Sequence, residues 1–184
     1  VKDSILNGKL IQYYLSGAVH GEHEYEDGNN IGFVRYWNEN GILISEDQYG
    51  YGENKQIIKE IGQWKRWNDK GDLKQIINYK EGKLDGVQLE YHENGQIKVE
   101  KFYIQGIQDG NQTIFHPNGR ISKRRKYIRG KFIEENPYKD YHENGVISGT
   151  GNIENGLEKG KWIYYYKSGL KKSEGKYRIH IYPH

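Results

Sequence analysis

Three histidines occupy the same place in a repeated motif, directly after an aromatic residue: His92, His116 and His142. Imidazole is a metal ligand and a general acid or base near neutral pH, so a metal or acid–base site is one interpretation. Equivalent positions in neighbouring β-hairpins lie about 10 Å apart, whereas two ligands of one Zn²⁺ each lie about 2 Å from the ion. The histidines therefore cannot share an ion. A structural role is favoured, and neither a metal nor a cofactor is predicted.

Two glutamates, Glu93 and Glu143, follow two of these histidines and raise the alternative of paired carboxylates for glycoside hydrolysis. Both fall in polar turn sequences that are expected to be exposed, and nothing in the sequence places a second carboxyl group of suitable character beside either. The chain has no cysteine, and it contains no G-x-S-x-G motif, phosphate-binding loop or dinucleotide fingerprint. The sequence therefore predicts a protein that is not an enzyme.

A basic stretch at residues 120–131, RISKRRKYIRGK, contains no acidic residue. On a β-strand, Lys123 and Arg125 would face one side and Arg124 and Lys126 the other. One interpretation is a surface for an anionic partner, and the alternative is a solvated stretch balanced by acids elsewhere. The first interpretation predicts partner contacts from these residues: Arg120, Lys123, Arg124, Arg125, Lys126 and Arg129.

Four tryptophans occupy positions that recur in every repeat. Trp37 and Trp67 stand at the position that holds an aromatic residue in every repeat, so both are expected in the core. Trp64 and Trp162 stand two residues after a repeat-opening glycine, where the residue type varies. We expect these two to reach a surface groove and to contact a partner, although packing is the commoner role of such rings.

The composition excludes several classes of protein. Net charge is only +3, from 28 basic and 25 acidic residues, which does not favour nucleic-acid binding. Aromatic residues make up 14% of the chain, which is unlike a disordered sequence. No apolar run is long enough to span a membrane as a helix. The compartment stays open between the cytoplasm and export, the latter if a signal segment preceded Val1.

A motif of regular spacing organises the chain. Around the turn glycine Gly95, a glycine stands nine residues before (Gly86), an aromatic four before (Tyr91), an apolar residue two after (Ile97) and a tyrosine eight after (Tyr103). The same marks recur, with a few departures, around six other turn glycines: Gly17, Gly41, Gly71, Gly119, Gly145 and Gly169. Internal repeats of this length indicate a repeat architecture.

Each repeat is expected to form a β-hairpin, because short alternating runs rich in Tyr, Trp, Ile and Val flank a glycine turn. Lys70 and the serines Ser16 and Ser168 precede turn glycines, and a type I′ turn would force them to positive φ. A type I turn with a G1 bulge is therefore predicted.

The predicted fold is all-β, an elongated single-domain solenoid of about seven stacked antiparallel β-hairpins over residues 1–184. The repeats are expected at residues 8–28, 32–52, 62–82, 86–106, 110–130, 136–156 and 160–177, with 178–184 as a C-terminal cap.

The core from Gly62 to Trp67 and from Tyr91 to Gly95 resembles the MORN repeat. More specifically, it resembles the bacterial variant found in YwqK-type proteins that carry an antitoxin label, with Y-x-x-N-G followed by a spaced Tyr and Gly. The resemblance covers about Gly8 to Tyr177. It implies a β-hairpin solenoid with a non-catalytic binding or scaffolding role. Asn136, which replaces an opening glycine, and the insertion after Tyr49 depart from the pattern and put regular stacking in doubt there.

Two functions follow as alternatives. The first is a protein-interaction module, including an antitoxin- or immunity-like binder of a partner protein. The second is an exported envelope or surface protein that binds a host protein, a glycan or an anionic lipid. The partner is expected to be a protein, with lipid or glycan as alternatives and nucleic acid disfavoured. The chain is expected to be a monomer or an edge-paired dimer, since open sheet edges can pair.

Overall fold

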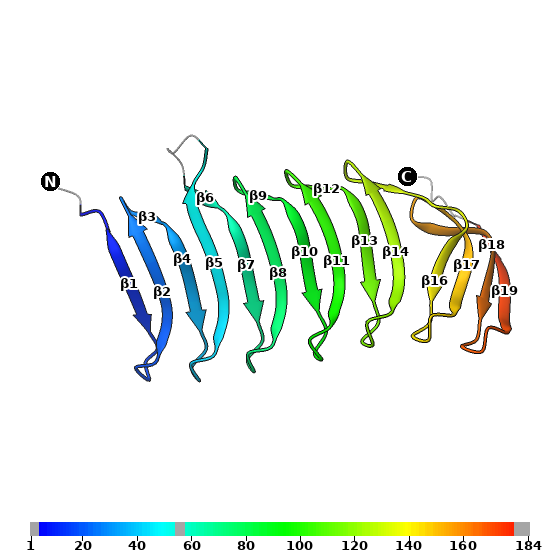
Figure 1. Cartoon of the computed structure of the whole chain (residues 1–184), viewed down its shortest axis with the longest axis horizontal. Helices are drawn as coiled ribbons and strands as arrows, with labels where there is room; N and C mark the ends of the chain where they lie inside the picture. Colours follow the sequence, from blue (N-terminus) through cyan, green and yellow to red (C-terminus); the bar gives the residue numbers. More distant parts are fainter. Residues whose placement is uncertain (1–3, 54–57, 179–184) are drawn as a thin grey trace. The chain divides into compact units, whose positions relative to one another are not determined.

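The computed structural model describes residues 4–53 and 58–178, and within them the chain forms 19 β-strands and no helix (Figure 1). Every strand pairing described is antiparallel, and each repeat is a hairpin. The prediction of an all-β fold of stacked hairpins is confirmed. The expected cap falls almost wholly on residues outside those described.

The chain divides into two compact units: unit 1 comprises Val1–Gly95 and Tyr103–Gly106, and unit 2 comprises Gln96–Phe102 and Ile107–His184. That residues 1–184 form one domain, and that its seven repeats have the expected boundaries, both stay predictions. Each unit is described by itself below.

Unit 1 consists of hairpins whose short first strand pairs with a longer second strand, which then pairs with the first strand of the next hairpin. Its strands are β1 (Gly8–Tyr13), β2 (Val19–Glu26), β3 (Asn29–Asn30), β4 (Gly32–Trp37), β5 (Leu43–Tyr51), β6 (Ile58–Glu60), β7 (Gly62–Trp67), β8 (Leu73–Lys80), β9 (Lys83–Leu84) and β10 (Gly86–Tyr91). The insertion after Tyr49 lengthens β5 to Tyr51, which pairs with Ile58 of β6.

Unit 2 continues the same scheme with β11 (Ile97–Ile104), whose last two residues are grouped with unit 1. The other strands are β12 (Ile107–Gln108), β13 (Gly110–Phe115), β14 (Ile121–Ile128), β15 (Lys131–Ile133), β16 (Tyr138–Tyr141), β17 (Ile147–Glu154), β18 (Leu157–Tyr165) and β19 (Lys171–Tyr177). The predicted irregularity at Asn136 is present. The strand β16 begins only at Tyr138, and Asn136 Oδ1 accepts a hydrogen bond from the Ile153 amide at 2.9 Å.

The first turn of each hairpin is a type I turn closed by a glycine. Gly41 N–H donates to the Asn38 carbonyl and Asn38 N–H donates to the Ile42 carbonyl, both at 2.9 Å, and the other repeats follow this scheme. The turn glycines have positive φ, whereas Ser16, Lys70 and Ser168 do not. Since only the glycine adopts the left-handed conformation, the predicted type I turn with a G1 bulge is confirmed.

A second turn joins the long strand of each hairpin to the next short strand. It is a two-residue turn in which both central residues have positive φ, as in Arg129 (48°) and Gly130 (77°). This is the type I′ geometry. Four other non-glycine residues take the first position of such a turn: Asp27, Glu81, Gln105 and Asn155. The Arg129 amide donates to Asp109 Oδ2 at 3.1 Å, which fixes the turn to the neighbouring strand end.

Arg129→Asn is expected to raise the free energy of unfolding by about 0.5–1 kcal/mol, because asparagine tolerates the left-handed conformation better than arginine. Urea unfolding followed by circular dichroism measures the change. Lys126→Asn removes the same charge from the same strand pair outside the turn and is the control. Equal effects of the two substitutions would show that charge, not backbone conformation, decides the result.

The interior of unit 1 is built on one face of the sheet. Val34 is 4% exposed, and its buried neighbours on the strands to either side are His23 and Asp47. The Trp64 ring lies between the rings of Tyr49 and Tyr79, with centroids 5.3 and 4.6 Å away, and its indole N–H donates to the Gln48 carbonyl. Aromatic contacts of this kind stabilise a sheet that has little aliphatic material.

The interior of unit 2 is centred on Trp162, which is 1% exposed and contacts the buried residues Tyr138 and Ile153, with Phe132 and Tyr164 packed around them. Trp162 lies in the wall of the cleft described below, although almost none of its surface is exposed, and its contact with a partner stays a prediction. Its indole N–H donates to the Asn152 carbonyl at 2.8 Å.

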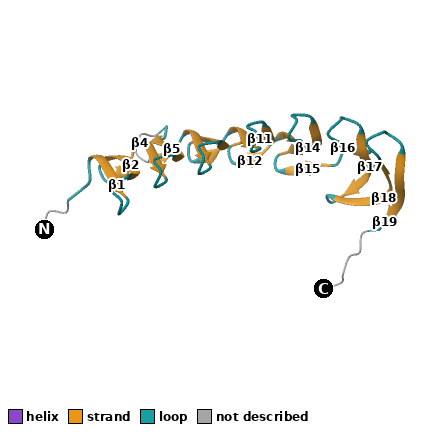
Figure 2. Cartoon of the chain, turned by 90° about the horizontal axis from the view of Figure 1, so that it is seen from below, coloured by secondary structure: helices purple, strands orange, loops and turns teal. Residues whose placement is uncertain are grey.

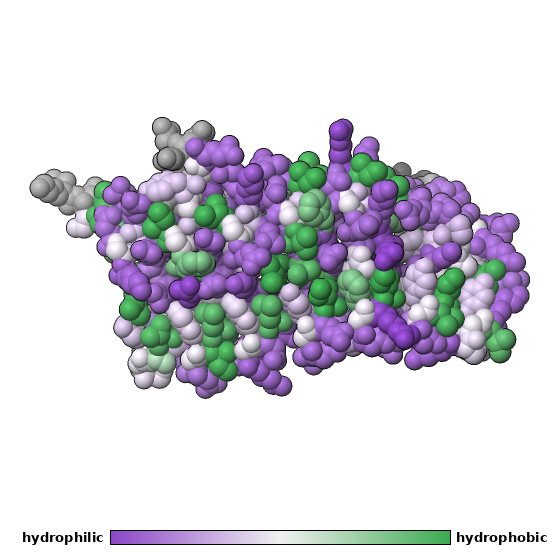
Figure 3. Space-filling model, in the orientation of Figure 1, coloured by the Kyte–Doolittle hydropathy of each residue, from purple (hydrophilic) through white to green (hydrophobic). Residues whose placement is uncertain are grey.

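The expected core residues Trp37 and Trp67 are half-buried. On the face seen in Figure 3, apolar residues form short stripes between polar ones.

Candidate binding surfaces of unit 2

The strand β14 divides the basic stretch between two faces of the sheet, as its alternation predicts. Lys123 and Arg125 line a cleft together with Tyr127. Arg124 and Lys126 alternate with them and are exposed on the opposite face. The candidate site therefore consists of two separate surfaces, which we call the cleft and the basic face.

The cleft has a volume of about 930 Å³ and lies entirely within unit 2. In Figure 2, β15 and part of the β17–β18 hairpin lie on the same side of unit 2, and residues of both line the cleft. The irregular repeat lies beside it: between the pairs Lys126–Ile133 and Lys123–Asp140 the register changes by four residues, where the regular repeats of unit 1 change by two. Besides the three residues of β14, the lining includes Lys131, Phe132, Glu134, Tyr138, Asp140, Ile153, Glu158 and Trp162.

Charged groups in the cleft are only partly paired. Lys123 Nζ lies 3.3 Å from Asp140 Oδ2 and 5.7 Å from the centre of the Tyr138 ring. The other carboxylate oxygen, Asp140 Oδ1, is buried and makes no hydrogen bond of good geometry to a described residue, and the same holds for the Tyr138 hydroxyl. Burial raises the pKa of Asp140, an effect that Lys123 opposes, and it raises the pKa of Tyr138 to about 12.

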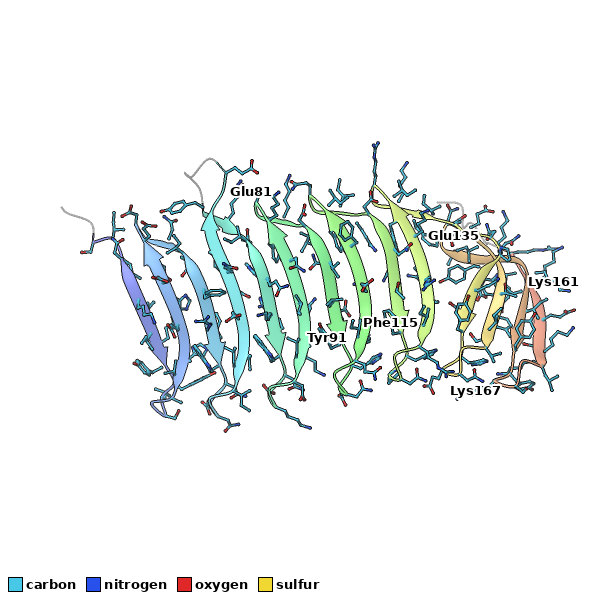
Figure 4. The ribbon with its side chains drawn as sticks, viewed as in Figure 1. Glu81, Tyr91, Phe115, Glu135, Lys161 and Lys167 are labelled. Carbon is cyan, nitrogen blue, oxygen red and sulfur yellow. The ribbon has the colours of Figure 1, made fainter. Side chains whose placement is uncertain are left out.

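The basic face consists of five exposed cations on four strands: Arg124, Lys126, Lys139, Lys161 and Lys176. The neighbours of Lys139 and Lys161 in sequence, Tyr138, Asp140 and Trp162, line the cleft, so these two lysines lie on the opposite face. In Figure 4 the side chain of Lys161 points away from β18, whereas Lys167 lies at the turn that follows.

Like charges oppose each other on the basic face. Lys161 is directly paired with Lys176 across β18 and β19. Lys123 pairs with Asp140, so the same antiparallel register places Arg124 opposite Lys139. Lys161 lies 3.2 Å from Glu174, whereas no ion pair to a described residue is found for Arg124, Lys126, Lys139 or Lys176.

The remaining predicted contact residues lie apart from these two surfaces. Arg120 is in the first turn of its hairpin, where Nη1 donates to the Asn144 carbonyl of the next hairpin. Arg129 is exposed in the type I′ turn. Trp64 belongs to unit 1 and is half-buried between two tyrosines. The structure thus brings together only part of the predicted set.

Two of the histidines join adjacent hairpins of unit 2. His116 Nε2 lies 2.8 Å from the Tyr141 carbonyl oxygen, and His142 Nε2 lies 2.8 Å from that of Tyr165. A carbonyl oxygen only accepts, so each imidazole donates from Nε2. These bonds give both histidines a structural role. Across residues 4–53 and 58–178, no group of three or more His, Asp or Glu side chains could hold a metal ion.

Part of this repeat scheme is similar to a known family of repeats. Residues 60–81 and 84–105 match the MORN repeat variant. The matched segments contain β7–β8 and β10–β11, and the turns of the other hairpins have the same geometry. Repeats of this family are binding modules rather than enzymes. No curated protein matches the chain.

In the part of the chain that the structure describes, no helix is present that could cross a membrane.

Proposed function

We propose that the chain is a non-catalytic protein-binding module and that an acidic surface of its partner docks on the basic face. The observation that carries this proposal is the set of exposed cations on one face, of which Arg124, Lys126, Lys139 and Lys176 form no ion pair with a described residue, whereas Lys161 lies 3.2 Å from Glu174. Complementary charge accelerates encounter and selects partners, and its effect falls with salt.

In unit 1, cations at equivalent positions of the sheet form ion pairs with a glutamate. Glu46, five residues after its turn glycine, lies 2.8 Å from Arg35 and 3.4 Å from Lys65. In unit 2 this position is Glu100, Arg124, Thr150 and Glu174 in successive repeats, so only the repeats that contain Arg124 and Lys139 lack the carboxylate. Since a carboxylate complements this position in unit 1, carboxylates of a partner protein are the simplest complement in these two repeats.

The arrangement also has an energetic cost that a partner would relieve. Like charges directly opposed across two strands destabilise a sheet by about 0.2–1 kcal/mol per pair. The pairs Lys161–Lys176 and Arg124–Lys139 both belong to the basic face. A docked carboxylate between two such cations turns repulsion into attraction, which favours the bound state.

An antitoxin- or immunity-like role is the finer form of this proposal, with a toxin as the acidic partner. It follows the resemblance to YwqK-type repeats of bacteria. In the alternative, an exported protein uses the same cations on an anionic lipid surface or a host molecule.

Reversing three cations of the basic face, Arg124, Lys139 and Lys161, to glutamate is expected to abolish capture of the partner. Each reversal replaces attraction by repulsion at the interface. Wild-type and variant proteins serve as parallel baits for lysate and envelope fractions of the source cell. Captured proteins are quantified by mass spectrometry.

The control bait carries the same three charge changes on exposed lysines of unit 1, Lys70, Lys80 and Lys83. The proposal expects at least one protein that the wild type and the control capture and the reversal variant does not. Equal capture by all three baits would refute docking on the basic face. Loss of binding to phosphatidylserine vesicles without loss of any protein would favour the lipid alternative.

A further inference from the structure

We infer that the cleft of unit 2 is a second binding site and that its ligand is a neutral, hydroxyl-rich molecule, a segment of carbohydrate. This site is on the opposite side of the sheet from the basic face and is independent of the partner proposed above.

The charges that line the cleft indicate a neutral ligand. Its three cations are Lys123, Arg125 and Lys131, and its three carboxylates are Glu134, Asp140 and Glu158. Several of these groups already interact with the protein. Lys123 is paired with Asp140, Glu134 Oε1 accepts from the Gly156 amide at 3.1 Å, and Glu158 Oε2 accepts from the Tyr164 hydroxyl at 2.8 Å. A ligand of either net charge would meet like charges as well as opposite ones.

The polar atoms without partners indicate a ligand that both donates and accepts hydrogen bonds. Tyr138 is 8% exposed and lines the cleft, and its hydroxyl makes no hydrogen bond of good geometry to a described residue, although the Arg125 guanidinium is close enough to lower its pKa against the effect of burial. Asp140 Oδ1 is in the same situation. Buried polar groups of folded proteins are nearly always satisfied, so such atoms in a cleft call for a ligand or ordered water. A sugar hydroxyl can donate to the carboxylate and accept from the tyrosine.

Both atoms are closed off from solvent, and the side chains of Lys123 and Arg125 lie beside them. Lys123 contacts the Asp140 carboxylate and the Tyr138 ring, and the Arg125 charge lowers the pKa of both groups against the effect of burial. Long basic side chains change rotamer readily on the surface. A ligand would reach the two oxygens once these side chains move aside, and it would then receive their N–H groups as further donors.

The size and walls of the cleft fit sugar rings. Its volume, about 930 Å³, lies within the usual range of small-molecule sites, roughly 300–1,000 Å³. Tyr127 and Phe132, whose ring centroids are 5.7 Å apart, are half-buried and form an apolar wall. The C–H faces of sugars pack on such rings, while their hydroxyl groups meet the charged groups that surround them.

Binding is tested by saturation-transfer NMR and calorimetry with maltotriose, cellotriose and triacetylchitotriose as probes. At least one is expected to bind the wild-type chain at millimolar concentration or below. Tyr138→Phe, which removes only the hydroxyl group, is expected to weaken that binding about tenfold or more. Asp140→Asn is a second variant with the same expectation. Because the module is proposed to be non-catalytic, the probe is expected to remain intact.

Tyr166→Phe is the control, since Tyr166 is 52% exposed at a turn outside the cleft. Removal of an unsatisfied buried hydroxyl does not weaken a fold, so Tyr138→Phe is expected to keep wild-type thermal stability. The inference is overturned if none of the saccharides binds, or if both cleft variants bind the saccharide as tightly as the wild type does. It is also overturned if the cleft binds members of a hexapeptide library and no saccharide. The triple charge reversal of the basic face leaves the cleft residues intact, so saccharide binding should survive it. The two proposals can therefore fail separately.

Discussion

Trp162→Ala is expected to lower the free energy of unfolding of unit 2 by about 3–5 kcal/mol, the usual cost of removing a fully buried large aromatic side chain. The ring is 1% exposed and packs directly on the backbone of Gly151, where an added Cβ would lie 2.5 Å from Trp162 Cγ. Nothing near the site can collapse into the space, because Tyr138 and Ile153 are fixed on paired strands. Urea unfolding measures the loss, and hydrogen exchange of peptides from β16 to β18 assigns it to unit 2.

The matched control is Lys161→Ala, one residue away on the exposed face, which is expected to change stability by no more than about 0.5 kcal/mol. A loss below about 1 kcal/mol for Trp162→Ala would contradict the assignment of this ring to the core of unit 2.

Asp47→Ala is expected to destabilise unit 1 by about 2–3 kcal/mol. Asp47 is 8% exposed, and its two carboxylate oxygens accept from Nη1 and Nη2 of Arg66. Such bidentate, charge-assisted bonds are among the strongest in proteins, and removing the acid leaves the guanidinium without its partner in a half-buried place. Arg66 also lies over the Trp64 ring, so its displacement would disturb the aromatic contacts of the unit.

A double-mutant cycle with Arg66→Ala isolates this interaction. We expect a coupling free energy of at least about 1 kcal/mol between the two sites, measured by urea unfolding. Strictly additive effects of Asp47→Ala and Arg66→Ala would show that the ion pair contributes nothing to stability.

The hairpin repeats could be predicted because local residue types determine them. Lys70, Ser16 and Ser168 excluded a type I′ first turn, and the structure has type I turns there. The type of the second turn could not be predicted, because Glu81, Gln105 and Arg129 disfavour positive φ. These residues adopt it nonetheless, since strand pairing on both sides imposes the geometry.

The position of Trp162 depended on a neighbour that the repeat pattern does not highlight. Gly151 faces it across the strands, at a place where other repeats carry side chains such as Asp47 and Arg125. The missing side chain leaves room for the indole. The cleft itself lies beside the irregular segment before Tyr138, where no periodic pattern exists from which to predict its shape.

The basic face was partly predictable. Counting from the turn glycines places Arg124, Lys139 and Lys161 on one side of the sheet, but the last two stand outside the basic stretch. Consecutive basic residues can be recognised in the sequence. Basic residues that are neighbours on different strands can be recognised only when the pairing register of the strands is known.

The most direct test of the central claim is zero-length carbodiimide cross-linking of the captured complex, with the linked peptides identified by mass spectrometry. Carbodiimide joins lysine amines to carboxylates only where they touch. The account predicts links from Lys126, Lys139, Lys161 and Lys176 to Asp or Glu residues of the partner. Links that come only from lysines of unit 1, such as Lys70 and Lys83, would contradict it.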